Sequence, residues 1–309
     1  MKANCPLPAT IVGSLLLACS GFVCGQATEW DHSMSDGQTA MAAKQYAQAE
    51  TSYRQALAFS EKHFKNDARS SATLVKLAES CNAQGKKDDA ETFANRAATS
   101  LADALKAHKP KNASEELQQA ESSAALFDRV GDIFSANEKY ADAEGMYQRV
   151  IAVRVHYADQ KPPAKPTNED FLRLLAQGAT NSQAKVADAE DKLGNLYVRE
   201  RKFSEAEELF RQSAAIREKV YGADQPPFAQ SLGELARCYA LQGEYARAEL
   251  LYKQVVEILE HTSFRDTAEM AACLENYALV LRKTGQEAQA KSVNDRAQAL
   301  RVQLSKTAH

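Results

Sequence analysis

The sequence has few of the residues that interrupt helices. Its 309 residues include only 13 glycines and 8 prolines, whereas alanine, glutamate, glutamine, lysine and leucine recur throughout. This composition favours helix over strand. With 44% hydrophobic and 26% charged residues, the chain has the composition of a soluble globular protein that is long enough to bury a sizeable core. We therefore expect an all-α fold with almost no sheet.

An excess of charge of one sign is also lacking. The 38 lysines and arginines nearly balance the 41 aspartates and glutamates, giving a formal net charge of −3. A nucleic-acid-binding surface usually needs a marked excess of basic residues. The composition therefore predicts no nucleic-acid partner.

The sequence lacks the common catalytic, metal-binding and nucleotide-binding motifs. It has no HExxH, GxGxxG, P-loop, GxSxG or CxxC pattern, and its six histidines are scattered. The cysteines outside the N-terminal segment are interpreted as small buried apolar residues, and they are Cys81, Cys238 and Cys273. Carboxylates such as Asp188, Glu190 and Asp191 are interpreted as solvated helix surface. We predict no enzyme, no metal site and no cofactor.

The N-terminal segment has the layout of an export signal. A lysine precedes an apolar run over residues 11–18, which is too short to span a membrane, and small residues follow. Cleavage would follow Gly25 or Ala27. Alternatively, Leu16-Leu17-Ala18-Cys19 resembles a bacterial lipoprotein box, with Cys19 as the lipidation site. Residues 1–27 thus predict an exported protein, periplasmic or secreted, with a lipid anchor in the second case. If this segment is not a signal, the chain is cytoplasmic.

An internal repeat organises the rest of the chain. A stripe of residues at spacings of three, four and three recurs six times, which places its members on one helix face. The copies are Tyr46-Ala49-Tyr53-Ala56, Lys87-Ala90-Ala94-Ala97, Tyr140-Ala143-Tyr147-Val150, Phe203-Ala206-Phe210-Ser213, Tyr245-Ala248-Tyr252-Val255 and Glu287-Ala290-Asn294-Ala297.

A second helical pattern precedes each stripe. Its small residue lies twelve positions before the central alanine of the stripe, at Gly37, Ala78, Gly131, Gly194, Ala236 and Ala278. Turn signals containing Gly85, Gly243 and Gly285 separate the two patterns. Each copy therefore predicts a helix-turn-helix hairpin. We expect the small residue of the first helix to face the alanine of the second, and the aromatic rings to fill the space toward the next hairpin.

This pattern resembles the tetratricopeptide repeat family. The central alanines are 41, 53, 63, 42 and 42 residues apart, longer than the 34 of the minimal repeat. Copies four to six, and the stretch from Arg217 to Pro226, are similar to the 42-residue kinesin-light-chain type. The resemblance implies a right-handed superhelical solenoid of about six hairpins over residues 28–309. The predicted repeats span residues 30–63, 71–104, 124–157, 187–220, 229–262 and 271–304.

Two departures from the repeat predict local features. Residues 109–112 break the chain before a long helix from Ala113 to Ala136. A Pro-rich connector over residues 160–167 precedes a helical insert from Asn168 to about Gln177. We expect a sub-domain boundary near this connector, with stacking continuous across it.

The resemblance also implies a concave groove lined by the first helices. The candidate ligand residues at groove positions are Asn195, Arg199, Arg237, Arg282 and Lys283. Such residues clamp a peptide carboxylate in some family members, although the lysine-first pattern of those clamps is absent here, and ordinary solvated residues are the alternative. Asp188 and Asp191 share this surface and are expected to pair with some of the cations. Glu79, Asp128 and Asp132 in the other half predict a groove that runs from acidic to basic.

These observations predict an exported adaptor or assembly scaffold that binds a peptide or partner helix in its groove. A self-associating structural protein of the envelope is the alternative. It rests on the final helix, which has no capping helix after it and is expected to leave four apolar residues partly uncovered, namely Ala297, Leu300, Val302 and Leu304.

Overall fold

The computed structural model describes residues 24–64, 67–158, 169–264 and 267–307. Over these ranges the chain forms twelve α-helices and no strand, which confirms the predicted all-α fold. Most of the predicted leader, including Cys19, and the connector at 160–167 lie outside the described residues. Residues 169–177 of the predicted helical insert form the beginning of a longer helix.

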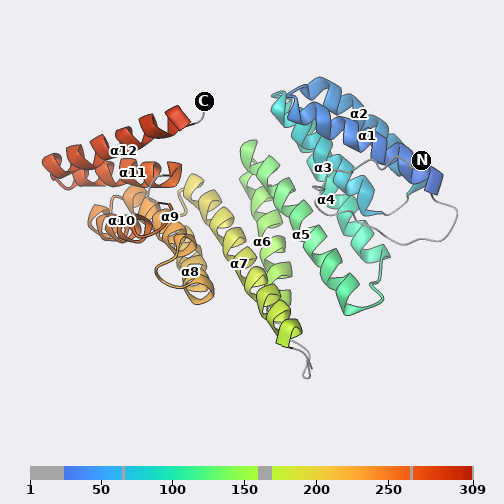
Figure 1. The fold of residues 1–309 in the computed structure, drawn as a ribbon. Helices are drawn as coiled ribbons and strands as arrows, with labels where there is room; N and C mark the ends of the chain where they lie inside the picture. The colour runs from blue at the N-terminus through green and yellow to red at the C-terminus, as the bar shows by residue number, and fades with distance from the viewer. Residues whose placement is uncertain (1–23, 65–66, 159–168, 265–266, 308–309) are drawn as a thin grey trace, which may run out of the picture.

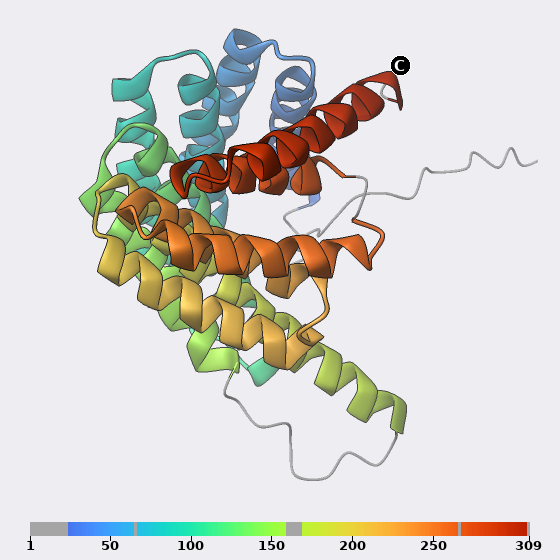
Figure 2. The same ribbon diagram turned by 90° about the vertical axis from the view of Figure 1, so that its left-hand side faces the viewer.

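The helices pair in chain order into six hairpins, as the repeat pattern predicted. Their bounds are α1 Cys24–Ala42, α2 Tyr46–His63, α3 Ala68–Ala83, α4 Lys87–Ala107, α5 Ala113–Ala136, α6 Tyr140–Ala158, α7 Glu169–Arg199, α8 Phe203–Tyr221, α9 Pro226–Gln242, α10 Tyr245–Glu260, α11 Ala268–Lys283 and α12 Glu287–Thr307. The hairpins follow a continuous arc from α1 to α12 (Figure 1), and the last three lie as successive layers (Figure 2). The long helix predicted over Ala113–Ala136 is α5.

Every hairpin turns through one residue in the left-handed region. Three of these residues are the glycines of the predicted turn signals, Gly85 (φ 76°), Gly243 (φ 86°) and Gly285 (φ 78°). The other three carry side chains, and they are Lys44 (φ 59°), Glu138 (φ 64°) and Arg201 (φ 62°). In all six turns the next residue donates its N–H to the carbonyl oxygen five residues earlier, at 2.8 to 3.0 Å. This bond satisfies a helix-end carbonyl and offsets the cost of the left-handed residue.

Three glycines of the first helices lie closest to aromatic rings of the second helices, where the repeat pattern predicted alanine. A Cβ built on Gly37 would lie 2.3 Å from Cε1 of Tyr53. The corresponding distances are 2.7 Å for Gly131 and the Tyr147 ring, and 2.8 Å for Gly194 and the Phe210 ring. The rings of the second helix therefore fill the space within their own hairpin, and glycine provides the room for them.

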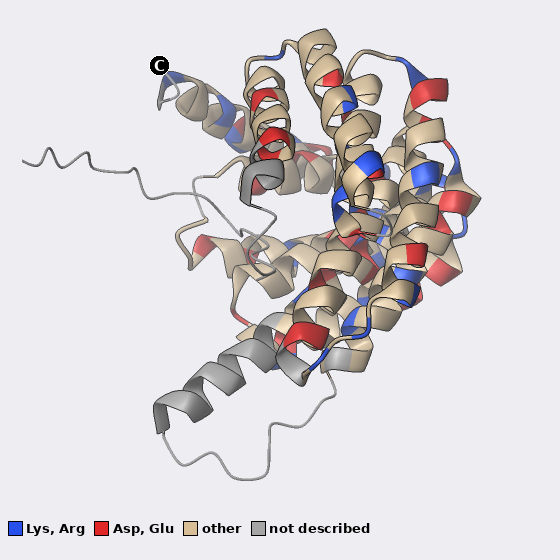
Figure 3. Ribbon diagram, turned by 90° about the vertical axis from the view of Figure 1, so that its right-hand side faces the viewer, with Lys and Arg blue, Asp and Glu red and all other residues tan. Residues whose placement is uncertain are grey.

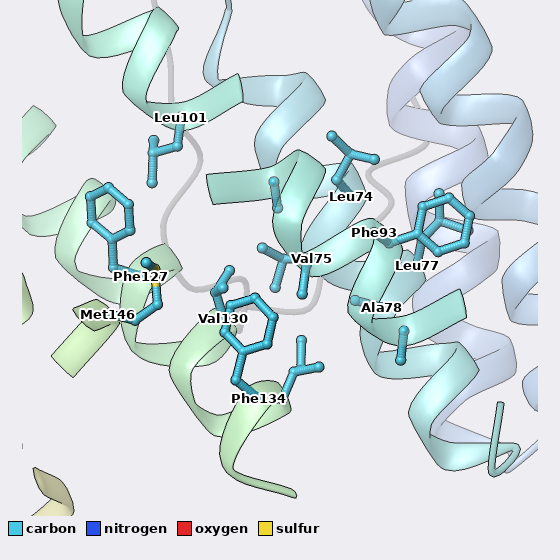
Figure 4. Close-up of a cluster of buried hydrophobic side chains, with 14 of the residues drawn as sticks. Leu74, Val75, Leu77, Ala78, Phe93, Leu101, Phe127, Val130, Phe134 and Met146 are labelled. Carbon is cyan, nitrogen blue, oxygen red and sulfur yellow. The ribbon is translucent and has the colours of Figure 1, made fainter. Parts of the chain in front are cut away.

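The apolar side chains form two buried clusters that meet in hairpin four. The first extends from Met34 to Leu196 and the second from Val198 to Leu300, and Tyr197 packs against both. Figure 4 shows part of the first cluster, where side chains of α3 and α4 lie near those of α5 and α6. The first cluster continues from hairpin three into α7, so packing is continuous across the two sides of residues 159–168.

Most of the apolar residues at the end of the final helix are covered by the rest of the protein. Ala297 and Leu300 are buried against α11, with exposed fractions of 0% and 8%, and Leu304 is half-buried. Of the four residues that the sequence predicted to be partly uncovered, only Val302 is exposed. The expectation that Ala297 and Leu300 would be left uncovered is therefore wrong. The outer face of α12 is mostly polar, as in a terminal repeat that faces solvent.

Candidate binding surface

The first helices of successive hairpins contact one another directly. Contacts join α3 to α5, α7 to α9, and α9 to α11, whereas no two consecutive second helices make comparable contacts among the described residues. In a curved stack the helices on the inner side approach each other most closely. The first helices therefore line the inner side of the arc, and we call their solvent-facing surface the inner face.

Polar contacts cross the inner face in its N-terminal half. The Trp30 indole of α1 donates over 3.1 Å to the hydroxyl of Thr73 of α3, which is completely buried. Arg129 of α5 donates to Glu79 of α3 over 2.6 Å. Glu79 is also 3.4 Å from the ammonium group of Lys76. The carboxylate at Glu79 is therefore engaged within the protein.

The two aspartates of α5 are bridged by one lysine of α7. Lys192 Nζ lies 2.8 Å from Asp128 and 2.9 Å from Asp132, and Asp132 also accepts from the Tyr147 hydroxyl over 2.8 Å. Although burial opposes it, bonding to the two carboxylates raises the pKa of Lys192. The expected acidic end of the groove is thus largely neutralised. Figure 3 likewise shows acidic and basic residues interspersed over the helices.

The structure brings two of the five candidate ligand residues together. Arg237 of α9 donates to the side-chain oxygen of Asn195 on α7, and also to Glu234 over 2.8 Å. Arg199 is exposed and donates to the carbonyl oxygen of Ser135 on α5 over 3.4 Å. The last two residues are exposed at the end of α11, and they are Arg282 and Lys283. Arg237 is therefore already partly neutralised, whereas the other cations face solvent.

The aspartates expected to pair with these cations pair elsewhere. Asp188 and Asp191 each lie 2.7 Å from the guanidinium of Arg217, which comes from the second helix α8. Asp191 and Glu190 are both only 6% exposed. The interpretation as solvated surface is therefore wrong for Glu190 and Asp191, whereas Asp188 is exposed as expected.

A family model for the tetratricopeptide repeat matches residues 185–261, which extend from within α7 to the residue after α10. This match falls on hairpins four and five, where the hairpin geometry follows the 42-residue spacing. The described residues therefore have the fold of a tetratricopeptide-repeat solenoid. A search of the curated proteins found no match.

Several solved structures share the architecture of this tetratricopeptide-repeat solenoid. BtubC (BKLC) from P. vanneervenii is 14% identical, with a TM-score of 0.58, over 91% of this chain and 92% of that one. A putative kinesin light chain from Podospora anserina is 20% identical, with a TM-score of 0.56, over 79% and 100%. PilW, a type IV pilus biogenesis factor, is 17% identical, with a TM-score of 0.51, over 89% and 93%. The resemblance to kinesin-light-chain repeats is thereby confirmed for the fold.

The tetratricopeptide-repeat fold is typical of scaffolds that present an extended concave surface to other proteins. The part of the chain that the structure describes contains no helix long and apolar enough to cross a membrane. The same residues contain no group of three or more side chains placed to hold a metal ion.

A shallow cavity of about 290 Å³ opens on the inner face. It is lined by Glu79, Asn82, Ala83, Arg129, Asp132 and Ile133.

Two exposed leucines on the inner face were not identified from the sequence. Leu241 of α9 and Leu279 of α11 are 52% and 51% exposed. Counting 42 residues along the repeat places Leu241 at the position of Arg199 in hairpin four, and Leu279 at that of Arg237 in hairpin five. The 42-residue period would have identified both positions. Each leucine occupies a groove position at which the other two C-terminal hairpins carry a polar residue.

Proposed function

We propose that this chain is a protein-interaction scaffold that captures a peptide or partner helix on the C-terminal half of its inner face. The exposed Leu241 and Leu279 carry the proposal, since they lie at groove positions and have no apolar cover. Arg199, Arg282 and Lys283 are exposed groove residues of the same half. An extended or helical segment with apolar side chains and carboxylates would complement this surface.

The contrast between the two halves supports this assignment. On the N-terminal half, the carboxylates of Glu79, Asp128 and Asp132 already have cationic partners within the protein. A ligand there would have to displace formed ion pairs. On the C-terminal half, it would bury uncovered leucine side chains and meet cations that face water. Binding to the C-terminal half of the inner face therefore has the more favourable free energy.

Selection of peptides from a random display library against the purified chain tests this function. We expect enriched sequences to combine bulky apolar residues with aspartate or glutamate. The double variant Leu279→Ser, Arg282→Ala should weaken a selected peptide by about tenfold or more, because it removes an exposed apolar contact and an exposed cation one helical turn apart on α11. Affinity is measured by fluorescence anisotropy.

The matched control is Leu250→Ser. Leu250 is 71% exposed but belongs to α10, a second helix that does not line the inner face. Its substitution should leave the affinity of the peptide unchanged. Equal weakening by the control and the groove variant, or failure of any peptide to bind with micromolar affinity, would contradict the proposed surface.

We also propose that the scaffold is exported, has no enzymatic role, and acts in the envelope or outside the cell. The charged, apolar and small residues of segment 1–27 support export, and a protein of similar fold, PilW, is a type IV pilus biogenesis factor. Intact mass of the mature chain from a bacterial host tests this. We expect either a lipid on Cys19, lost in Cys19→Ala, or a chain starting at Gln26 or Thr28. An unprocessed cytoplasmic chain would refute export.

A further inference from the structure

The joint between hairpins four and five contains a buried ionic cluster. Arg217 of α8, only 3% exposed, lies at its centre. One guanidinium nitrogen donates to the Ser231 hydroxyl of α9 over 2.7 Å and lies 2.7 Å from Asp191 of α7. The other donates to Asp188 of α7 over 2.7 Å. A single guanidinium therefore links three helices and two hairpins.

The cluster contains more negative than positive charge. Glu190 is 6% exposed, and its Oε2 atom has no hydrogen-bond partner among the described residues. It is adjacent to Asp191, so two buried carboxyl groups lie near one guanidinium, whereas the side chain of Asp188 is 61% exposed to solvent. Buried Glu50 in hairpin one differs, because Lys86, Gln84 and Arg54 all donate to its carboxylate. That bonding lowers the pKa of Glu50 to about 2. Glu190 has no such compensation.

The next joint of the same solenoid is apolar. At 42 residues further along, the counterparts of Ser213, Arg217 and Ser231 are Val255, Leu259 and Cys273, all of them buried. The counterparts of Glu190 in hairpins five and six are Leu232 and Leu274, also buried. The fold can therefore close this joint with hydrocarbon. Charge at the four–five joint is a specific feature of that joint.

The other charged groups around the cluster do not neutralise Glu190. From α9, Glu234 adds a further negative charge near Asp191. On the opposite side of α7, Arg154 of α6 donates to the carbonyl oxygen of Lys185, and Lys185 pairs with Glu121 of α5. Burial and then the charge of Asp191 raise the pKa of Glu190 to about 7, although Arg217 opposes this. Burial likewise raises that of Asp191 to about 6.

We propose that this joint is a pH-dependent hinge of the solenoid. When the joint is closed, a proton on Glu190 removes one uncompensated buried charge. When it opens, water solvates the carboxylate, whose pKa returns toward the ordinary 4.5. The closed joint therefore binds more protons than the open joint between about pH 4.5 and pH 7. Rising pH across this window favours opening.

Opening of this joint changes the inner face. The contact between Asn195 of α7 and Arg237 of α9 crosses the same joint. Loosening the joint would separate these two side chains and alter the spacing between groove positions of hairpins four and five. The pH around the protein would thereby adjust the shape of the surface without a change in its residues.

Hydrogen exchange of the whole chain at pH 5.5, 6.5 and 8.0 tests the hinge. After correction for the intrinsic exchange rates, we expect amides of α8 and α9 to open at least about tenfold more at pH 8.0 than at pH 5.5. Amides of α10 and α11, at the apolar joint, should show no such increase. In Glu190→Leu, which introduces the residue of the equivalent positions, the pH dependence at α8 and α9 should largely disappear.

Glu218→Gln, an exposed carboxylate of α8, is the matched control and should behave as the parent chain. Corrected exchange of the parent that does not change between pH 5.5 and pH 8.0 would overturn the proposal. So would a pH dependence in Glu190→Leu as large as that of the parent, because Asp191, whose pKa is raised only to about 6, contributes the smaller part above pH 5.5. If that variant does not fold, carboxyl carbon NMR of the parent decides the question, because an ordinary titration midpoint near 4.5 for Glu190 would also exclude the hinge.

Discussion

Replacing Arg217 with alanine is expected to lower the free energy of unfolding by about 3 kcal/mol at pH 7.5, because breaking a buried ion pair leaves uncompensated charge behind. The guanidinium is almost fully buried and contacts Asp188, Asp191 and Ser231. Removing it leaves the Asp191 carboxylate inside the protein, where neither of its oxygens has a hydrogen-bond partner among the described residues. Urea unfolding followed by circular dichroism measures the loss.

The loss of unfolding free energy in Arg217→Ala should be smaller at low pH. The pKa of Asp191 is raised to about 6, so this group takes up a proton in the folded protein before it would do so in the unfolded chain. Below about pH 5 the carboxyl is mostly neutral, and the absence of Arg217 costs less. A loss that is the same at pH 5 and pH 7.5 would contradict this account.

Arg211→Ala is the matched control on the same helix. Arg211 is 53% exposed; it pairs with Glu207, four residues earlier, and donates to the Tyr239 hydroxyl of α9 over 2.8 Å. An exposed pair contributes about 0.5 kcal/mol or less and a hydrogen bond about 1 kcal/mol, so the control should lose clearly less stability than Arg217→Ala. Because solenoids can unfold hairpin by hairpin, hydrogen exchange in α7, α8 and α9 should show where each variant is weakened.

Substitution of Gly194 by alanine is expected to destabilise hairpin four by about 2 kcal/mol through overpacking. The new Cβ would lie 2.8 Å from Cε1 and 3.0 Å from Cζ of Phe210, whose ring is completely buried. Neither the ring nor α7 can move without disturbing the packing around it. Equivalent positions do hold alanine in other hairpins, so we expect a strained fold and not a failure to fold.

Gly233→Ala provides the opposite control. Gly233 is also inside a first helix, but a Cβ added there meets nothing within 4 Å. Alanine is favoured over glycine in a helix by about 0.5–1 kcal/mol, so this variant should be slightly more stable than the parent. Thermal unfolding of the two variants should thus shift in opposite directions. A shift of Gly194→Ala in the stabilising direction would show that the ring moves aside freely.

Much of the fold follows from local sequence patterns. The spacing of Ala206, Phe210 and Ser213 depends only on the period of a helix, and all three are buried in α8 as the period implies. The glycine turns were predictable because a left-handed residue favours glycine. The turns at Lys44, Glu138 and Arg201 were not, because their left-handed conformation is imposed by the two helices that they join.

The candidate binding surface was predicted less well. Asn195 and Arg237 do come together, since repeat periodicity places them on adjacent first helices. The pairing of the other charges depended on distances that the sequence does not contain. Lys192, for example, pairs with Asp128, which is 64 residues earlier in the chain.

The sequence by itself determined that this protein is a stack of helical hairpins, because helix period, small residues and turn residues are local properties. Only the tertiary structure decided which charged groups are in water. Glu190 and Asp191 are adjacent to charged residues in the sequence, like many exposed carboxylates, yet α7 is covered by α6 on one side and α8 on the other. Burial depends on those neighbouring helices, and it is burial that raises the pKa of these two carboxyl groups beside Arg217.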